Sequence, residues 1–109
     1  MKIALIGHSF VRDLESYANG HTPILADSSH SFRYFWRPGS CFDFWLNHRT
    51  LLEDCISFGP EIIYIVLGSN SIVNSIPLAE TKQKAKAFYK LLKEVLPLAV
   101  IVQCEIEDI

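Results

Sequence analysis

The sequence predicts an α/β domain built on a parallel sheet, and three observations carry this prediction. Apolar strand-like runs alternate with amphipathic helical stretches, strand then helix three times over, before a final strand. Such alternation implies right-handed crossovers and helices on both faces of the sheet. The chain has 109 residues, enough for one core, and 50% of them are apolar, which excludes a disordered chain. We therefore expect residues 1–109 to form a single domain.

The first strand and helix follow directly from the N-terminal pattern. Residues 2–6 are a short apolar run that ends at Gly7, as expected for a buried strand. Residues 10–18 carry apolar side chains at spacings of three and four, which predicts a helix that Asn19-Gly20 ends. The stretch 21–30 is polar and rich in turn residues, so we expect an irregular loop there.

A second strand and helix are expected next. Residues 32–37 are rich in aromatic side chains and predict a strand that Pro38-Gly39 closes. Ser40 and Asp43 have the spacing of a capping box. We therefore expect one helix to run from Ser40 to about Ile56.

The second half contains the most apolar predicted strand. Residues 61–67 are almost continuously apolar, which is typical of a central parallel strand buried on both faces. We expect a polar loop over 68–76, a helix from Pro77 to about Val95, and a fourth strand over 98–104. This last strand has no predicted neighbour on its far side, and bare edges are normally covered. We expect either a completing segment or self-association there.

Charge and hydropathy exclude several classes of function. The formal net charge is −2, whereas a non-specific nucleic-acid binder is strongly basic, so we expect no nucleic-acid partner. No apolar run approaches the roughly 18–20 residues that cross a bilayer, and no signal-peptide pattern is present. We therefore expect no membrane association and a cytoplasmic location. Cys41, Cys55 and Cys104 lack the spacing of a metal knuckle, so we expect reduced, mostly buried thiols and no metal.

Small and polar residues follow each of the first three predicted strands, where parallel sheets bind ligands. The three loops read Gly7-His8-Ser9-Phe10, Pro38-Gly39-Ser40 and Gly68-Ser69-Asn70-Ser71. This set fits a serine nucleophile with oxyanion donors. Ser9 Oγ would attack a carbonyl carbon, while the N–H groups of Ser9 and Gly39 and the amide of Asn70 would hold the oxyanion.

The three loops resemble the sequence blocks of the SGNH, or GDSL-type, hydrolases, which are esterases and lipases on a flavodoxin-like three-layer α/β/α sheet. Gly7-His8-Ser9-Phe10 is similar to the family's Gly-Asp-Ser-Leu block, Gly39 to its glycine donor, and Gly68-Ser69-Asn70-Ser71 to its Gly-x-Asn-Asp block. The resemblance implies a parallel sheet of order 2-1-3-4 and no cofactor. It implies a small, acetyl-like ester as substrate.

The same resemblance assigns roles within the three blocks. Ser9 would be the nucleophile, and Ser9, Gly39 and Asn70 the oxyanion donors, with Gly7, His8 and Gly68 as supporting residues. The longer run Gly-His-Ser-Phe-Val-Arg-Asp-Leu, residues 7–14, also resembles SGNH-like domains of some transposable-element-associated proteins.

The sequence departs from the family in one serious respect. Family members take their base and acid from a late Asp-x-x-His block after a fifth strand, and this sequence contains no Asp-x-x-His. We therefore expect an incomplete domain, without the fifth strand, whose esterase activity is weak or absent. His8 adjoins Ser9, but neighbouring side chains at a strand end diverge, so it is a poor candidate base. The other three histidines, His21, His30 and His48, are expected to be exposed or structural.

Other interpretations of these residues stay open. Ser9 could cap the first helix, and Gly39 and Asn70 could be turn residues. A phosphate-binding loop is disfavoured because bulky Phe10 and Val11 follow Ser9 at once. The alternative function is a catalytically dead SGNH-like module for binding or assembly.

Overall fold

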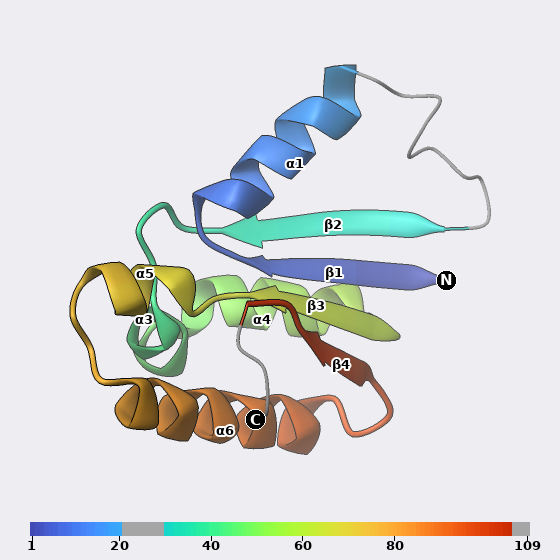
Figure 1. Ribbon diagram of the computed structural model, residues 1–109. Helices are drawn as coiled ribbons and strands as arrows, with labels where there is room; N and C mark the ends of the chain where they lie inside the picture. Colours follow the sequence, from blue (N-terminus) through green and yellow to red (C-terminus); the bar gives the residue numbers. More distant parts are fainter. Residues whose placement is uncertain (21–29, 106–109) are drawn as a thin grey trace.

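The computed structural model describes residues 1–20 and 30–105. The predicted loop at 21–30 therefore lies outside the described residues, except for its last position. Helices and strands alternate along the chain (Figure 1): β1 (Lys2–Gly7), α1 (Ser9–Gly20), β2 (Ser31–Trp36), α3 (Phe42–Asn47), α4 (Arg49–Phe58), β3 (Ile62–Val66), α5 (Ser69–Val73), α6 (Leu78–Val95) and β4 (Val100–Gln103).

The strands of the described chain form one parallel sheet of order β2-β1-β3-β4, as predicted. In the central strand β1, Leu5 pairs with Tyr34 of β2 and with Tyr64 of β3. On the far side of β3, Tyr64 pairs with Val102 of β4. Because all the strands run the same way, the loops that follow β1, β2 and β3 meet at one edge of the sheet.

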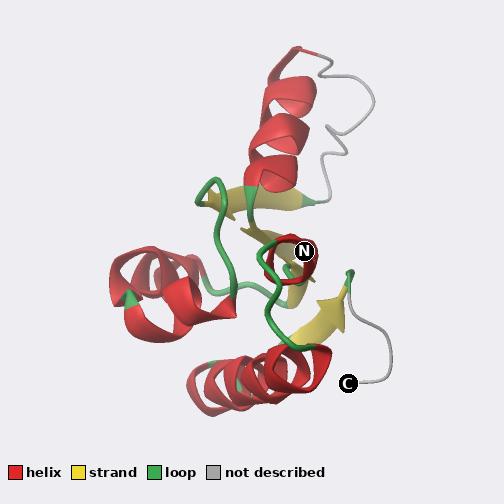
Figure 2. Ribbon diagram, turned by 60° about the vertical axis from the view of Figure 1, so that its left-hand side comes forward, coloured by secondary structure: helices red, strands yellow, loops and turns green. Residues whose placement is uncertain are grey.

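One face of the sheet carries the hydrophobic core. Ala4 and Ile6 of β1 and Ile63 and Ile65 of β3 are almost fully buried on this face. Strand side chains alternate between faces, so these four lie on the same side. The helices α3, α4 and α6 cover them (Figure 2) with buried side chains of Phe42, Trp45, Leu52, Cys55, Ala85, Phe88 and Leu92.

The opposite face is covered only in part. Helix α1 contacts β1 and β2 there, and none of the described helices lies over β3 and β4 on this side. As a result Tyr64 is half-buried, and Val100 and Val102 of β4 are 58% and 36% exposed. The prediction that the third strand is buried on both faces therefore holds for Val66 but not for Ile62 and Tyr64, which none of the described helices covers on this face.

The single helix expected from Ser40 to Ile56 is two helices, α3 and α4. They meet at His48, whose backbone is extended, with φ −118° and ψ 102°. The His48 N–H donates to Phe44 O at 2.8 Å, and the His48 ring stacks on the Phe44 ring with 4.6 Å between centroids. These contacts end α3 and turn the chain.

The predicted capping box is also wrong. Helix α3 has Cys41 as its N-cap, with no side-chain capping bond. The Ser40 hydroxyl instead accepts a hydrogen bond from Trp45 Nε1 at 3.2 Å and donates one to Gly7 O at 3.4 Å. The local pattern predicted that the Ser40 hydroxyl would cap the helix, but this hydroxyl bonds to Gly7 and Trp45 instead.

Smaller differences concern the loop after β3, the last strand and the cysteines. Part of the loop predicted over 68–76 is the short helix α5. Strand β4 begins at Val100, because the preceding Leu98 is 95% exposed and the Ala99 N–H bonds back to Leu96 O at 3.1 Å.

Cys55 is buried as expected, but Cys41 is half-buried and Cys104 is exposed. None of the described helices is long and apolar enough to cross a membrane.

Candidate active site

Hydrogen bonds join the loops that follow β1, β2 and β3. The carbonyl oxygen of Gly7 accepts from the Arg37 N–H at 3.0 Å and from the Ser40 hydroxyl at 3.4 Å. The Asn70 side-chain amide donates to Ser40 O at 3.2 Å. The same Ser40 is held from the core side by Trp45 Nε1. The three predicted blocks thus meet at one edge of the sheet through direct contacts.

At Gly7, β1 lies close to both α1 and β3. A Cβ atom on Gly7 would lie 2.5 Å from Val66 O and 2.9 Å from Val11 Cγ2. Both distances are shorter than van der Waals contact, and the nearer atom belongs to the backbone. A side chain at this position would therefore collide with β3 and α1, and only glycine fits here.

Ser9 is the first residue of α1, and its side chain is partly exposed. Within residues 1–20 and 30–105, no hydrogen bond joins its hydroxyl to another group. Its N–H belongs to the first turn of the helix, where backbone N–H groups have no acceptor within the helix. Neither the hydroxyl nor the N–H of Ser9 therefore has a hydrogen-bond partner among the described residues.

His8, not Ser9, caps helix α1. The Phe10 N–H donates to His8 Nδ1 at 3.2 Å, and the Val11 N–H donates to His8 O at 3.0 Å. The alternative interpretation of Ser9 as the N-cap is therefore wrong, because the preceding ring supplies the acceptor.

The ring of His8 is buried and engaged at both nitrogens. Nε2 lies 2.5 Å from Glu105 Oε1 and 3.3 Å from Ser69 Oγ. Because the Phe10 N–H donates to Nδ1, we assign the ring proton to Nε2. Nε2–H then donates to the Glu105 carboxylate. Neither ring nitrogen is free to take a proton from Ser9.

Glu105 is the residue at this edge that the sequence analysis missed. Its Oε2 accepts the Ser69 N–H at 2.7 Å, in addition to the bond from His8. Burial alone would raise the pKa of this carboxyl. Hydrogen bonds from the Ser69 N–H and hydroxyl and from the His8 ring, together with the electrostatic attraction of that ring, outweigh burial and lower the pKa. Glu105 directly follows the predicted strand 98–104 and lies two residues after β4, so the rule that located the other loops could have found it.

The remaining predicted residues occupy separate positions on the same edge. Gly39 is exposed and has φ +73°, with no atom within 4 Å of the place of a Cβ. Gly68 is buried and also has a positive φ, of 134°. Asn70 is half-buried, and its amide has a second N–H beyond the one bonded to Ser40. No hydrogen bond between described residues joins the Ser9 side chain to Gly39 or Asn70.

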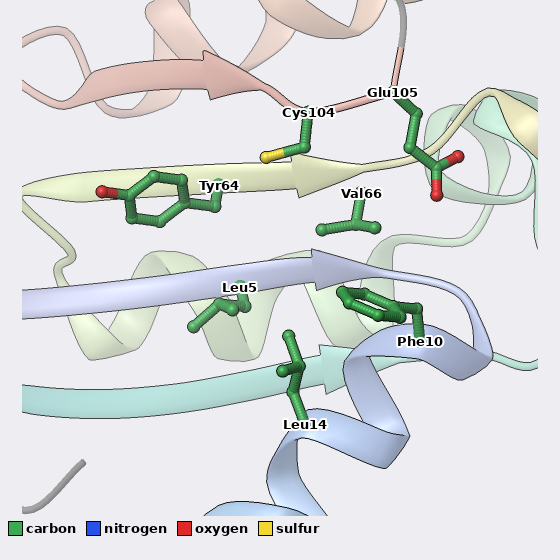
Figure 3. Close-up of a pocket in the computed structure, with 7 residues that line it drawn as sticks. All are labelled: Leu5, Phe10, Leu14, Tyr64, Val66, Cys104 and Glu105. Atoms are coloured by element: carbon green, nitrogen blue, oxygen red, sulfur yellow. The ribbon is translucent and has the colours of Figure 1, made fainter. Parts of the chain in front are cut away.

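An apolar groove opens beside this edge on the α1 face (Figure 3). It has a volume of about 470 Å³. Its floor is formed by side chains of β1 and β3, one wall by α1, and its far end by residues that follow β4. The lining residues are Leu5, Phe10, Leu14, Tyr64, Val66, Cys104 and Glu105. The carboxylate that holds His8 thus also borders the groove.

The other histidines lie away from Ser9's loop. His48 sits at the junction of α3 and α4, where its ring contacts Phe44. His30 precedes β2, at the opposite end of that strand from the candidate site. His21 lies outside the described residues. Within the described residues no group of three or more His, Cys, Asp or Glu side chains could hold a metal ion.

Comparison with known proteins identifies the fold. No family model and no curated protein matches the sequence. Solved structures do match. A protein from Parabacteroides merdae ATCC 43184, described as a GDSL-like lipase, superposes with a TM-score of 0.68 and 18% identity over 95% of this chain and 58% of its own. The acetyl xylan esterase AlAXEase superposes with a TM-score of 0.73 and 13% identity, over 95% and 57% of the two chains.

A third structure agrees with these two. It is a protein from Bacteroides fragilis NCTC 9343 described as an acylhydrolase, with a TM-score of 0.62 and 18% identity over 94% of this chain and 46% of its own. The chain therefore spans about half the length of the solved structures it matches. It has the SGNH, or GDSL-type, hydrolase fold, as the three sequence blocks predict, and identities this low establish the fold alone.

Proposed function

We propose that the chain is an SGNH-type serine esterase domain that acts on a small, acetyl-like ester, and that the 109-residue form is weak or inactive. The observation that carries the proposal is the contact of the three predicted blocks at one sheet edge, through Gly7 O, Ser40 and the Asn70 amide. The fold is shared with structures described as a lipase, an acetyl xylan esterase and an acylhydrolase.

In the proposed reaction Ser9 Oγ attacks the carbonyl carbon of the ester, and negative charge develops on the carbonyl oxygen. The N–H groups of Ser9 and Gly39 and the second N–H of Asn70 then donate to that oxyanion. None of the described groups bonds to the hydroxyl of Ser9, which supports its role as nucleophile. Removing one such donor typically slows turnover about 100–1000-fold.

The reaction also needs a base to take the proton from Ser9. Both nitrogens of His8 are engaged, by the Phe10 N–H and by Glu105. His48 and His30 contact other parts of the fold. The proposal therefore places the base outside the described residues, where the resembled family has its Asp-x-x-His block. Without that base, only the residual catalysis of the oxyanion donors remains.

One observation favours a second candidate function, a module for binding or assembly without catalysis. The histidine next to Ser9 is committed to structural bonds, and an apolar groove stands open beside it. A domain that had lost its catalytic base would keep this fold and this groove.

Labelling with a fluorophosphonate probe, followed by intact mass, tests the two candidates. The purified chain is compared with the Ser9→Ala and Ser69→Ala variants, because Ser69 is the serine at the same edge that contacts His8. A mass increase that Ser9→Ala abolishes and Ser69→Ala retains would support Ser9 as the nucleophile.

The opposite outcomes are equally informative. Labelling that Ser69→Ala abolishes would contradict the assignment of Ser9. No labelling of a chain shown to be folded by circular dichroism would favour the non-catalytic module for this form.

A further inference from the structure

The carboxylate of Glu105 accepts hydrogen bonds from two different loops of the candidate site. Its Oε1 lies 2.5 Å from His8 Nε2, in the loop after β1, and its Oε2 accepts the Ser69 N–H at 2.7 Å, at the start of α5. The Glu105 side chain is 18% exposed and reaches these groups from the segment after β4 (Figure 3). Each carboxylate oxygen therefore serves one of the two loops that carry Ser9 and Asn70.

The bond to Oε1 acts on Ser9 through the His8 ring. Because Nε2–H donates to Glu105, Nδ1 is left as an acceptor, and it receives the Phe10 N–H at 3.2 Å. This bond spans Ser9 and holds the first turn of α1. With the ring proton on Nδ1 instead, the Phe10 N–H would face another N–H, and the cap would be lost. Glu105 thus favours the ring form that keeps the backbone of Ser9 in place.

The bond to Oε2 acts on Asn70 through the start of α5. This helix has only five residues, Ser69–Val73, and a helix so short is not stable without contacts outside itself. The Ser69 N–H has no acceptor within the helix, and Glu105 supplies one. Asn70 follows directly, and its side-chain amide donates to Ser40 O at 3.2 Å. These two bonds together hold the second N–H of the Asn70 amide in one direction.

We propose that Glu105 is a positioning residue of the oxyanion site, whose carboxylate holds the Ser9 N–H and the Asn70 amide in the arrangement that binds one oxygen atom. The inference rests on the proposed esterase function, since it takes these two groups as oxyanion donors. Glu105 acts through His8 and Ser69 and does not touch the substrate. Such placement matters because a displacement of about 1 Å can slow a reaction about 100-fold.

The variant Glu105→Gln separates charge and acceptors from size. Glutamine has nearly the same volume, but it has one acceptor oxygen in place of two, and its NH₂ group only donates. The His8 and Ser69 donors bond to different carboxylate oxygens, so Glu105→Gln leaves one of them without an acceptor. Glu94→Gln is the matched control, because it makes the same chemical change at an exposed position on α6.

The protonated nitrogen of the His8 ring is the first measurement, made by NMR on the ¹⁵N-labelled wild-type chain. At alkaline pH, where imidazole is neutral, the ring should carry its proton on Nε2 and none on Nδ1. This measurement uses the wild-type chain alone, so it does not depend on the folding of a variant or on activity.

Backbone and side-chain amide signals are compared next, at a temperature where thermal melting shows every variant folded. Glu105→Gln should shift the signal of the Ser9 N–H or that of the Asn70 side-chain amide. Glu94→Gln should leave both signals where they are in the wild-type chain. A general loss of stability would not single out these two groups.

The rate of fluorophosphonate labelling tests the consequence for the reaction, because the phosphonyl oxygen takes the place of the oxyanion. Glu105→Gln should be labelled at Ser9 about 100-fold more slowly than the wild-type chain, and Glu94→Gln at the wild-type rate. A chain that is not labelled at all counts against the proposed esterase function of this form, and the NMR comparison then decides the role of Glu105.

Three results would overturn the proposal. A His8 ring proton on Nδ1 in the wild-type chain would break the connection from Glu105 to α1. Unchanged Ser9 and Asn70 signals in Glu105→Gln would mean that the carboxylate does not hold these groups. Equal labelling rates for the wild-type chain and Glu105→Gln would mean that the reaction does not depend on this placement.

Discussion

The ring of His8 and the carboxylate of Glu105 lie 2.5 Å apart, although 97 residues separate them in the chain. The contact joins Glu105, two residues after β4, to the turn between β1 and α1. Because Glu105 also accepts the Ser69 N–H, it connects the ends of β1, β3 and β4 at the candidate site. The other ring nitrogen of His8 holds the start of α1.

His8→Ala should therefore destabilise the chain by about 1–2 kcal/mol, since it removes a helix cap and leaves the half-buried Glu105 carboxylate without one donor. His8→Asn should recover part of this loss, because an asparagine side chain caps the helix but does not reach Glu105. Urea denaturation measures both. Equal losses in the two variants would contradict the capping role of His8.

The lowered pKa of Glu105 predicts how stability depends on pH. A carboxyl whose pKa is lower in the folded state stabilises the fold above its unfolded value, and this stabilisation is lost as the pH falls through the folded value. For Glu105 the loss begins near its ordinary value of 4.5 and continues below it. Wild-type stability should drop more steeply there than that of Glu105→Gln. Urea midpoints at a series of pH values compare them, and parallel curves would exclude the effect.

Two glycines of the candidate site, Gly7 and Gly39, should respond differently to alanine. In Gly7→Ala the new Cβ would meet Val66 O at 2.5 Å, and we expect a loss of about 3 kcal/mol, at the top of the range for overpacking. In Gly39→Ala the new Cβ meets nothing within 4 Å, so the loss should be about 1 kcal/mol from the positive φ alone. Thermal melting ranks them, and the reverse order would refute this account of the packing.

Ser40 and Trp45 should behave as a coupled pair. Ser40→Ala leaves the buried Trp45 N–H without its acceptor, which should cost about 1–3 kcal/mol. Trp45→Phe removes that donor, so adding Ser40→Ala to it should cost less than Ser40→Ala alone. A double-mutant cycle by urea denaturation gives the coupling energy. Strictly additive losses would show that the hydrogen bond contributes nothing.

The parallel sheet and the meeting of the three blocks could be predicted from local patterns, whereas the strand order was implied by the resemblance to the SGNH hydrolases. Apolar runs such as 61–67 identify strands, and the polar residues at strand ends must share one edge in a parallel sheet. This pattern alone was enough to predict that Gly7 and Asn70 lie at that edge. The side-chain roles proposed for Ser9 and Gly39 stay predictions.

The features that the sequence did not predict depend on contacts between distant or non-periodic residues. The break at His48 arises from its stacking on Phe44, and neither residue type is a helix breaker. Ser40 has the spacing of a cap, but Gly7 and Trp45 compete for its hydroxyl. Glu105 acquires its role only when β4 lies beside β3. No local pattern specifies such contacts.

The register of β1 has a consequence for how the chain folds as it is made. Ile3 pairs with Ile62, so one edge of this strand has no partner until residues of β3 have left the ribosome. At roughly 5–20 residues per second, this takes several seconds. Throughout that time the apolar segment Lys2–Gly7 is an attractive site for chaperones and a starting point for aggregation. Translation speed over the first half of the message should therefore influence the yield of folded protein.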